Sequence, residues 1–144
     1  MLSLRAVALV GTVLAIALIG APAATAATEA GDECVGNLAE GPFTLIPEAR
    51  ASGGALPLAA PVGGVVTAWK VNSGLTATVP EFMAAFRPTG KAGTFEVVGE
   101  SNQEDVKQGL NVFPTRIPVH AGDRFGPVPV GEESPVYCST GDTG

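Results

Sequence analysis

The chain has 144 residues, of which 15% are charged, and a formal net charge of −6 at pH 7. This acidic balance argues against nucleic acid and anionic membrane surfaces as partners, because both require clustered Lys and Arg. The length suffices for one domain with one hydrophobic core.

The N-terminal residues have the pattern of an export signal. Arg5 precedes a mostly apolar run, Ala6–Ile19, and Ala24-Thr25-Ala26 offers the small residues that signal peptidase requires. The run is shorter than the roughly 20 apolar residues that span a bilayer. We therefore expect 1–26 to be a cleaved signal peptide and the mature protein to be secreted, extracellular and free of a membrane anchor.

The mature chain alternates short apolar runs with turns rich in Gly and Pro and shows no convincing helix. We expect a disordered lead over 27–33, a β-sandwich domain over 34–139 and a loose tail over 140–144. The predicted fold is an antiparallel sandwich of about eight short strands. The candidate strands are 43–46, 56–58, 63–71, 75–79, 81–87, 94–100, 112–119, 125–130 and 135–138.

The stretch Gly63–Val71 is expected to be the central strand of the core. Alternation places Val65, Thr67, Trp69 and Val71 on one face. Trp69 is the only tryptophan, and a large aromatic side chain on such a strand is expected in the core. The alternative for Trp69 is a platform that stacks on carbohydrate.

Proline residues decide the structure that we expect for two segments of the chain. The segment 81–87 fits one helical turn or a strand face, and Pro80 before it and Pro88 after it favour a strand. The segment 112–119 alternates well but contains Pro114 and Pro118, which predict an edge position because proline has no N–H to donate.

Three segments resemble one known group of proteins. They are similar to segments of small secreted proteins of high-GC Gram-positive bacteria, a group with no assigned function. The segments are Gly-Val-Val-Thr-Ala-Trp-Lys-Val at 64–71, Phe95–Ser101, and the run Phe113–Gly126, which contains Val119-His120-Ala121-Gly122-Asp123-Arg124-Phe125-Gly126. The resemblance covers less than half of the mature chain. It implies a jelly-roll-like sandwich and carries no catalytic residues.

Candidate site residues are few. Asp123, with Glu132 and Glu133, is a weak candidate for a calcium site. Hard cations require several converging oxygens, and these three residues do not follow the spacing of an EF-hand calcium-binding loop. The simpler role of Asp123 is to accept hydrogen bonds from its own turn. His120 is the only histidine, so a zinc site or a catalytic triad would depend on it alone, and we expect it to be exposed.

These residues favour a non-catalytic protein without cofactors that binds an extracellular or cell-envelope ligand, such as a carbohydrate or a protein. The alternative is a small secreted hydrolase, similar to a glycosidase, that uses loop carboxylates such as Glu104-Asp105 or Glu132-Glu133. The two cysteines of an exported domain predict a Cys34–Cys138 disulfide, with Tyr137 packed near it.

Overall fold

A computed structural model describes residues 28–32, 34–37, 41, 43–47, 56–131 and 135–137. The predicted signal peptide and tail, Glu132, Glu133 and Cys138 lie outside the described residues. Within the described ranges there is no helix with the length and apolar character needed to cross a membrane.

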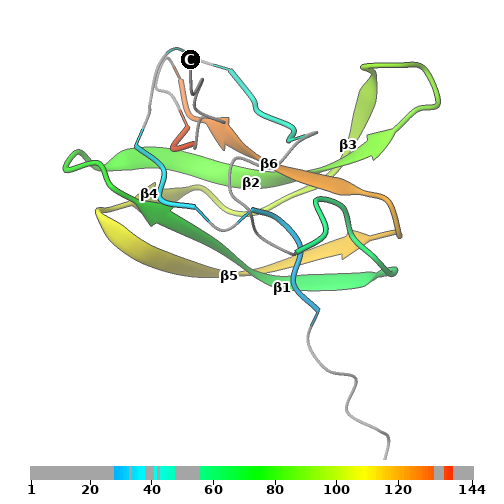
Figure 1. Ribbon diagram of the computed structural model, residues 1–144, viewed down its shortest axis with the longest axis horizontal. Helices are drawn as coiled ribbons and strands as arrows, with labels where there is room; N and C mark the ends of the chain where they lie inside the picture. Colours follow the sequence, from blue (N-terminus) through cyan, green and yellow to red (C-terminus); the bar gives the residue numbers. More distant parts are fainter. Residues whose placement is uncertain are drawn as a thin grey trace, which may run out of the picture.

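In the part of the chain that the structure describes, six antiparallel strands form two facing sheets (Figure 1). They are β1 (Gly64–Ser73), β2 (Val79–Pro88), β3 (Phe95–Glu100), β4 (Glu104–Val106), β5 (Gly109–Val119) and β6 (Arg124–Pro129). One sheet is the β1–β5 pair, and the other is built on β2. The prediction of an all-β fold with two antiparallel sheets is confirmed.

Strand β2 is central to the larger sheet. Its residues Ala84 to Phe86 pair with both β3 and β6, and Glu81 pairs with both β4 and β6. A strand has only two edges. Strand β6 therefore occupies one edge of β2, whereas β3 and β4 lie one after the other along its second edge. The strand prediction for 81–87 is confirmed, whereas the central position expected for Gly63–Val71 is wrong, because β1 pairs with β5 alone among the named strands.

The described part of the chain has fewer strands than the eight expected. Residues 43–46 and 56–58 are not in a strand, and 135–137 contributes only an isolated bridge at Tyr137. The segment 75–79 was predicted as a strand ended by Pro80, but β2 begins at Val79 and runs through Pro80. Pro80 is tolerated there because it is only the second residue of the strand.

Strand β1 departs from simple alternation. Its pairing with β5 shifts register between Val66 and Ala68. As a result, Val66 and Trp69 both pack in the interior, and Val65 is exposed. The expectation that Val65 shares the face of Trp69 is therefore wrong. The expected faces of β5 are confirmed, with Ile117 and Val119 buried and the two prolines exposed.

The space between the sheets holds two apolar clusters. One gathers around Ala85 and Ile117, and the other around Trp69, which is 4% exposed and lies 4.6 Å from Phe113 between ring centroids. The prediction that Trp69 is a core residue is confirmed. The buried members of the two clusters are Ala60, Ala85, Ile117 and Val119 in the first, and Trp69, Val79, Val106 and Val136 in the second.

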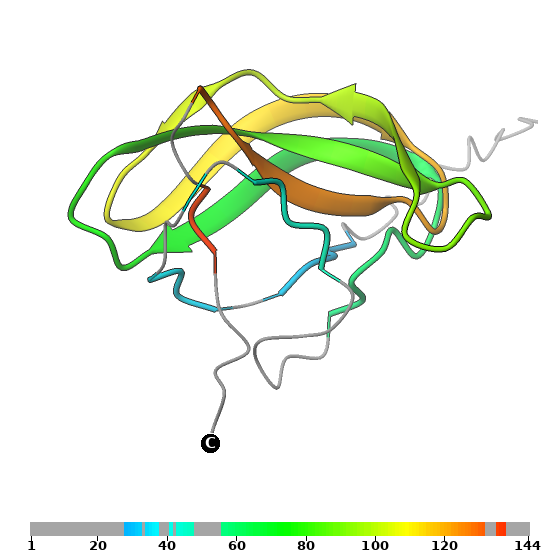
Figure 2. The same ribbon diagram turned by 90° about the horizontal axis from the view of Figure 1, so that it is seen from above.

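The segment 43–47 covers the outside of the larger sheet, and Figure 2 shows it in cyan near the orange β6. Gly126 of β6 has no room for a Cβ, because the Leu45 carbonyl lies against it. The Arg124 side chain donates to the Pro47 carbonyl at 3.1 Å. The segment 43–47 is thus a layer on the sheet, although it is not a strand.

The two chain segments that carry the cysteines lie side by side. Gly36 packs so closely on Val136 and Tyr137 that a Cβ at Gly36 would lie 2.5 Å from a Val136 methyl carbon. Gly36 also pairs with Ser73 at the end of β1. Cys138 lies outside the described residues, so the Cys34–Cys138 disulfide stays a prediction.

Candidate functional site

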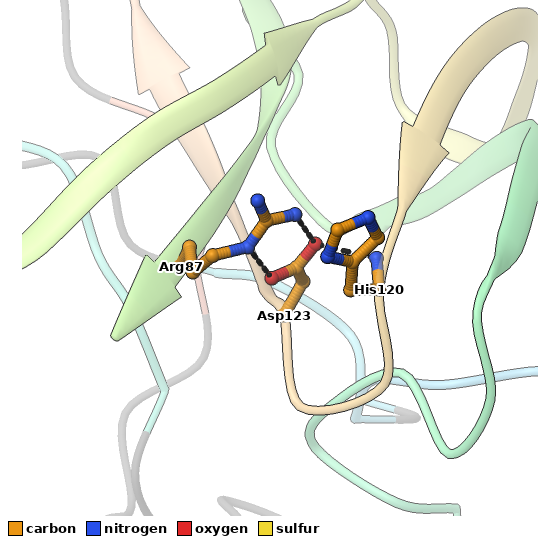
Figure 3. Close-up of polar contacts among 3 residues, drawn as sticks. All are labelled: Arg87, His120 and Asp123. Carbon is orange, nitrogen blue, oxygen red and sulfur yellow. Dashed lines mark hydrogen bonds and ion pairs between the residues drawn. The ribbon is translucent and has the colours of Figure 1, made fainter. Parts of the chain in front are cut away.

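Asp123 is held in the tight turn that follows β5 (Figure 3). Its Oδ1 accepts from Arg87 Nε and its Oδ2 from Arg87 Nη2, each at 2.8 Å, and Oδ2 also accepts from the His120 backbone N–H at 2.7 Å. The hydrogen bonds from Arg87, more than the one from His120, lower the pKa of Asp123, although burial opposes them. The predicted bond from Asp123 to its own turn is confirmed.

The Arg87 partnership was not predicted from the sequence, because the two residues are brought together only by the β2–β6 pairing. Both Asp123 carboxylate oxygens accept hydrogen bonds from Arg87 in this ion pair. The arrangement therefore gives no support to the hypothesis that Asp123 binds calcium. Glu132 and Glu133 lie outside the described residues. Among the residues that are described, no three His, Cys, Asp or Glu side chains gather as a metal site would require.

The exposure expected of His120 is confirmed, whereas the packing of Tyr137 near the disulfide stays a prediction, because Cys138 lies outside the described residues. The His120 side chain is exposed. The Tyr137 ring meets the Phe43 ring edge-on at 5.3 Å.

The carboxylate pair Glu104-Asp105 is separated by the strand that carries it. Both residues are in β4, and consecutive strand residues point to opposite faces. Glu104 is opposite Glu81 of β2 in the pairing, and Asp105 is opposite Pro80. A hydrolytic site that needs two facing carboxylates therefore cannot be built from these neighbours.

Glu81 is the most unusual carboxyl in the described part of the chain, and the sequence analysis did not single it out. Its side chain is fully buried, its Oε2 accepts from the Val136 N–H at 2.8 Å, and its Oε1 has no hydrogen-bond partner among the described residues. Burial raises its pKa to about 7, and the hydrogen bond from Val136 partly opposes this shift. A signal was present, because Glu81 interrupts the apolar row Val79, Met83 and Ala85.

A cleft of about 340 Å³ lies on the outer face of the larger sheet, opposite to the face that carries Glu81. Its floor is formed by β2 and β3, and the covering segment 43–47 contributes one wall. Its lining is mostly apolar, with one carboxylate. The lining residues are Thr44, Ile46, Ala84, Phe86, Phe95, Val97, Glu100 and Val128.

The strands determine which side chains reach this cleft. Phe95 and Val97 alternate on β3, as the sequence predicted, and β3 then carries one extra residue, Val98, opposite the Ala85–Phe86 step of β2. This bulge turns Val98 and Gly99 toward the interior, where Gly99 lies against Ile117, and returns Glu100 to the outer face. The cleft therefore has an apolar floor and an acidic rim.

The volume and lining are typical of small ligand sites, which are mainly apolar with few polar groups. No family model, curated protein or solved structure matches this chain. The geometry of the cleft is therefore the main evidence on function.

Proposed function

We propose that the protein is a secreted, non-catalytic β-sandwich of jelly-roll-like type that binds an apolar group of an extracellular or cell-envelope ligand in the outer cleft. The observation that carries this proposal is the cleft itself, in which Phe86, Phe95 and Val97 line a space on the sheet surface. Val97 is 51% exposed there, so apolar surface is available to a ligand. The signal-like residues 1–26 and the resemblance to small secreted bacterial proteins support an extracellular place.

The arrangement favours an apolar ligand group over a stacked sugar. The only tryptophan is buried between the sheets, and Tyr137 packs on Phe43. The aromatic rings in the cleft belong to Phe86, which is buried, and Phe95, which is partly covered by the Arg124 guanidinium at 5.9 Å from its ring centroid. Neither ring offers the open face that a stacked sugar requires.

The test uses N-phenyl-1-naphthylamine, a neutral apolar dye whose fluorescence rises in an apolar site. The mature protein is expected to bind the dye saturably, and Val97→Ser is expected to weaken binding about tenfold, because the substitution removes roughly 1.4 kcal/mol of apolar contact. Val112→Ser is the matched control, since Val112 is 56% exposed in the middle of β5 on the other sheet. Equal binding by the two variants, or no saturable binding by the native protein, would refute the proposal.

A further inference from the structure

One edge of the larger sheet is open along two strands. β3 and β4 follow each other along the same edge of β2, and within the described residues neither has a second strand neighbour. The connection between them stays attached to β2, because Ser101 N donates to the Met83 carbonyl at 2.8 Å and Met83 N donates to Ser101 Oγ at 2.9 Å. Residues 95–106 thus form one continuous edge, and Figure 2 shows it along the outline of the molecule.

An open edge of this kind presents backbone donors and acceptors to any chain that can lie beside it. In an antiparallel sheet, alternate residues direct their N–H and C=O groups away from the existing partner. Such an edge is a template for another strand unless it is blocked. No proline lies between Phe95 and Val106, so each of these residues has an N–H to donate.

The edge is acidic along its whole length. It carries Glu96, Glu100, Glu104 and Asp105, and no Lys or Arg occurs between Lys91 and Lys107. Arg87, opposite Glu96 on β2, has its guanidinium held by Asp123, and the Arg124 guanidinium lies over the Phe95 ring at 5.9 Å from its centroid. Pairing this edge with the same edge of a second copy would bring carboxylates together, which disfavours self-association.

The apolar cleft lies beside this edge. Phe95 and Val97 of β3 contribute to it, and a strand added next to β3 would place alternate side chains on the same outer face. An apolar side chain of the added strand would lie next to Val97 and reach the cleft. Its basic side chains would lie on the opposite face, next to Glu96 of β3 and Glu104 of β4.

We propose that the β3–β4 edge binds an extended segment of a partner protein, in which basic residues alternate with apolar ones, by adding it as an antiparallel strand. Main-chain hydrogen bonds hold the segment, Glu96 and Glu104 select its charge, and the cleft takes one of its apolar side chains. The last point rests on the proposed function, whereas strand addition and charge selection do not.

The test is fluorescence anisotropy with the mature, full-length protein and a labelled peptide of alternating lysine and valine. A matched peptide carries N-methyl groups on every second residue along one edge, which keeps the charge and removes the donors. The native peptide is expected to bind at least tenfold more tightly than the methylated one. Equal affinity would overturn strand addition and indicate nonspecific attraction between opposite charges.

Two variants test charge selection. Glu96→Gln combined with Glu104→Gln is expected to weaken binding of the peptide at least fivefold and to reduce its salt dependence, whereas Glu29→Gln, beside β1, is expected to leave binding unchanged. Equal effects of the two changes would overturn the proposal, and so would a concentration-dependent dimer whose formation blocks the peptide.

The outcome is separable from that of the dye. Dye binding without peptide binding would leave the proposed function intact and overturn strand addition. Peptide binding that Val97→Ser does not affect, with no dye binding, would refute the cleft and support the edge.

Discussion

At the scale of single residues, the buried carboxyl of Glu81 makes folding depend on pH. Its pKa of about 7 in the folded protein lies above its usual value of 4.5. Below pH 4.5 both the folded and unfolded states hold the proton, so the folded state carries no penalty. Between pH 4.5 and 7 the unfolded chain releases this proton while the folded protein keeps it, so the free energy of unfolding falls as the pH rises.

We expect this contribution to lower the free energy of unfolding by about 3 kcal/mol between pH 4.5 and 7.5. Glu81→Gln keeps the shape and cannot ionise, so it should remove most of this slope and be more stable than the native protein at pH 7.5. Urea denaturation at several pH values measures how the free energy of unfolding of each variant depends on pH. Glu104→Gln, at the register partner on β4, is the control and should keep the native slope. An unchanged slope in Glu81→Gln would contradict the assignment.

The ion pair of Arg87 and Asp123 has the opposite dependence on pH. Because the pKa of Asp123 is lowered in the folded state, its contribution is complete above the usual value near 3.8 and is lost as the pH falls through the lowered pKa. Asp123 is 1% exposed and joins the end of β2 to the turn before β6. The pair therefore links two strands of one sheet through their ends.

We expect Asp123→Asn to lower the free energy of unfolding at pH 7 by about 2 kcal/mol, because it leaves the guanidinium without its two-point partner. Thermal or urea unfolding at neutral pH measures the change. Lys70→Met breaks the exposed Lys70–Glu29 pair and should cost under about 0.5 kcal/mol. Similar losses in both variants would mean that Asp123 acts as an ordinary surface charge.

At the scale of elements, the covering segment 43–47 depends on the absence of a side chain at Gly126. An added methyl group would collide with the Leu45 backbone, which has no flexible end to move aside. We expect Gly126→Ala to release 43–47 from β6 and to lower stability by about 1–3 kcal/mol. Hydrogen exchange should increase at 43–47, and dye binding should weaken as Thr44 and Ile46 leave the cleft.

Gly64→Ala is the matched control, since Gly64 is also in a strand and has open space around its missing Cβ. It should keep native exchange rates at 43–47. Unchanged exchange in Gly126→Ala would mean that the segment is not seated on β6.

The strands also show which structural features the alternation of apolar and polar residues can predict. Alternation predicted the faces of β3 and β5 and the burial of Trp69, because it depends only on neighbouring residues. It failed at Val65, because the register shift in β1 arises from its pairing with β5. It failed again at 43–46, whose apolar residues cover a sheet instead of joining one.

The candidate site was less predictable for a related reason. The cleft combines Ile46, Phe86, Val97 and Val128, which come from four separate segments and meet only once the strand order is known. The ion pair of Arg87 and Asp123 likewise requires β2 and β6 to be neighbours. Only Glu81 could have been noticed from its sequence neighbours, because it is a charged residue within an otherwise apolar row.

At the scale of the whole molecule, the first and last described segments of the domain lie together. Gly36 packs against Val136 and Tyr137, so the chain on either side of the sandwich is already close before any covalent bond is considered. This placement supports the proposed Cys34–Cys138 disulfide. The bond would close a loop that contains all six strands.

We expect the denatured, non-reduced protein to show no free thiol, and reduction to lower the free energy of unfolding by about 4–5 kcal/mol in the chain-entropy model. Thiol titration and urea denaturation with and without reductant measure the two effects. Replacing both cysteines by alanine should reproduce the reduced stability. Two titratable thiols in the non-reduced monomer would rule out the bond.

The pairing of β1 with β5 also has a consequence for folding. Gly64 is opposite Val119 and Ser73 is opposite Gly109, so three other strands lie between the partners along the chain. The β2–β3 hairpin closes over a short turn, whereas the β1–β5 pairing closes a much longer loop, so we expect the hairpin to form first. Trp69 packs against Val79 and Val106 of the facing sheet and against Phe113 of β5, so we expect the change in its fluorescence to report the step in which the β1–β5 pair docks on that sheet.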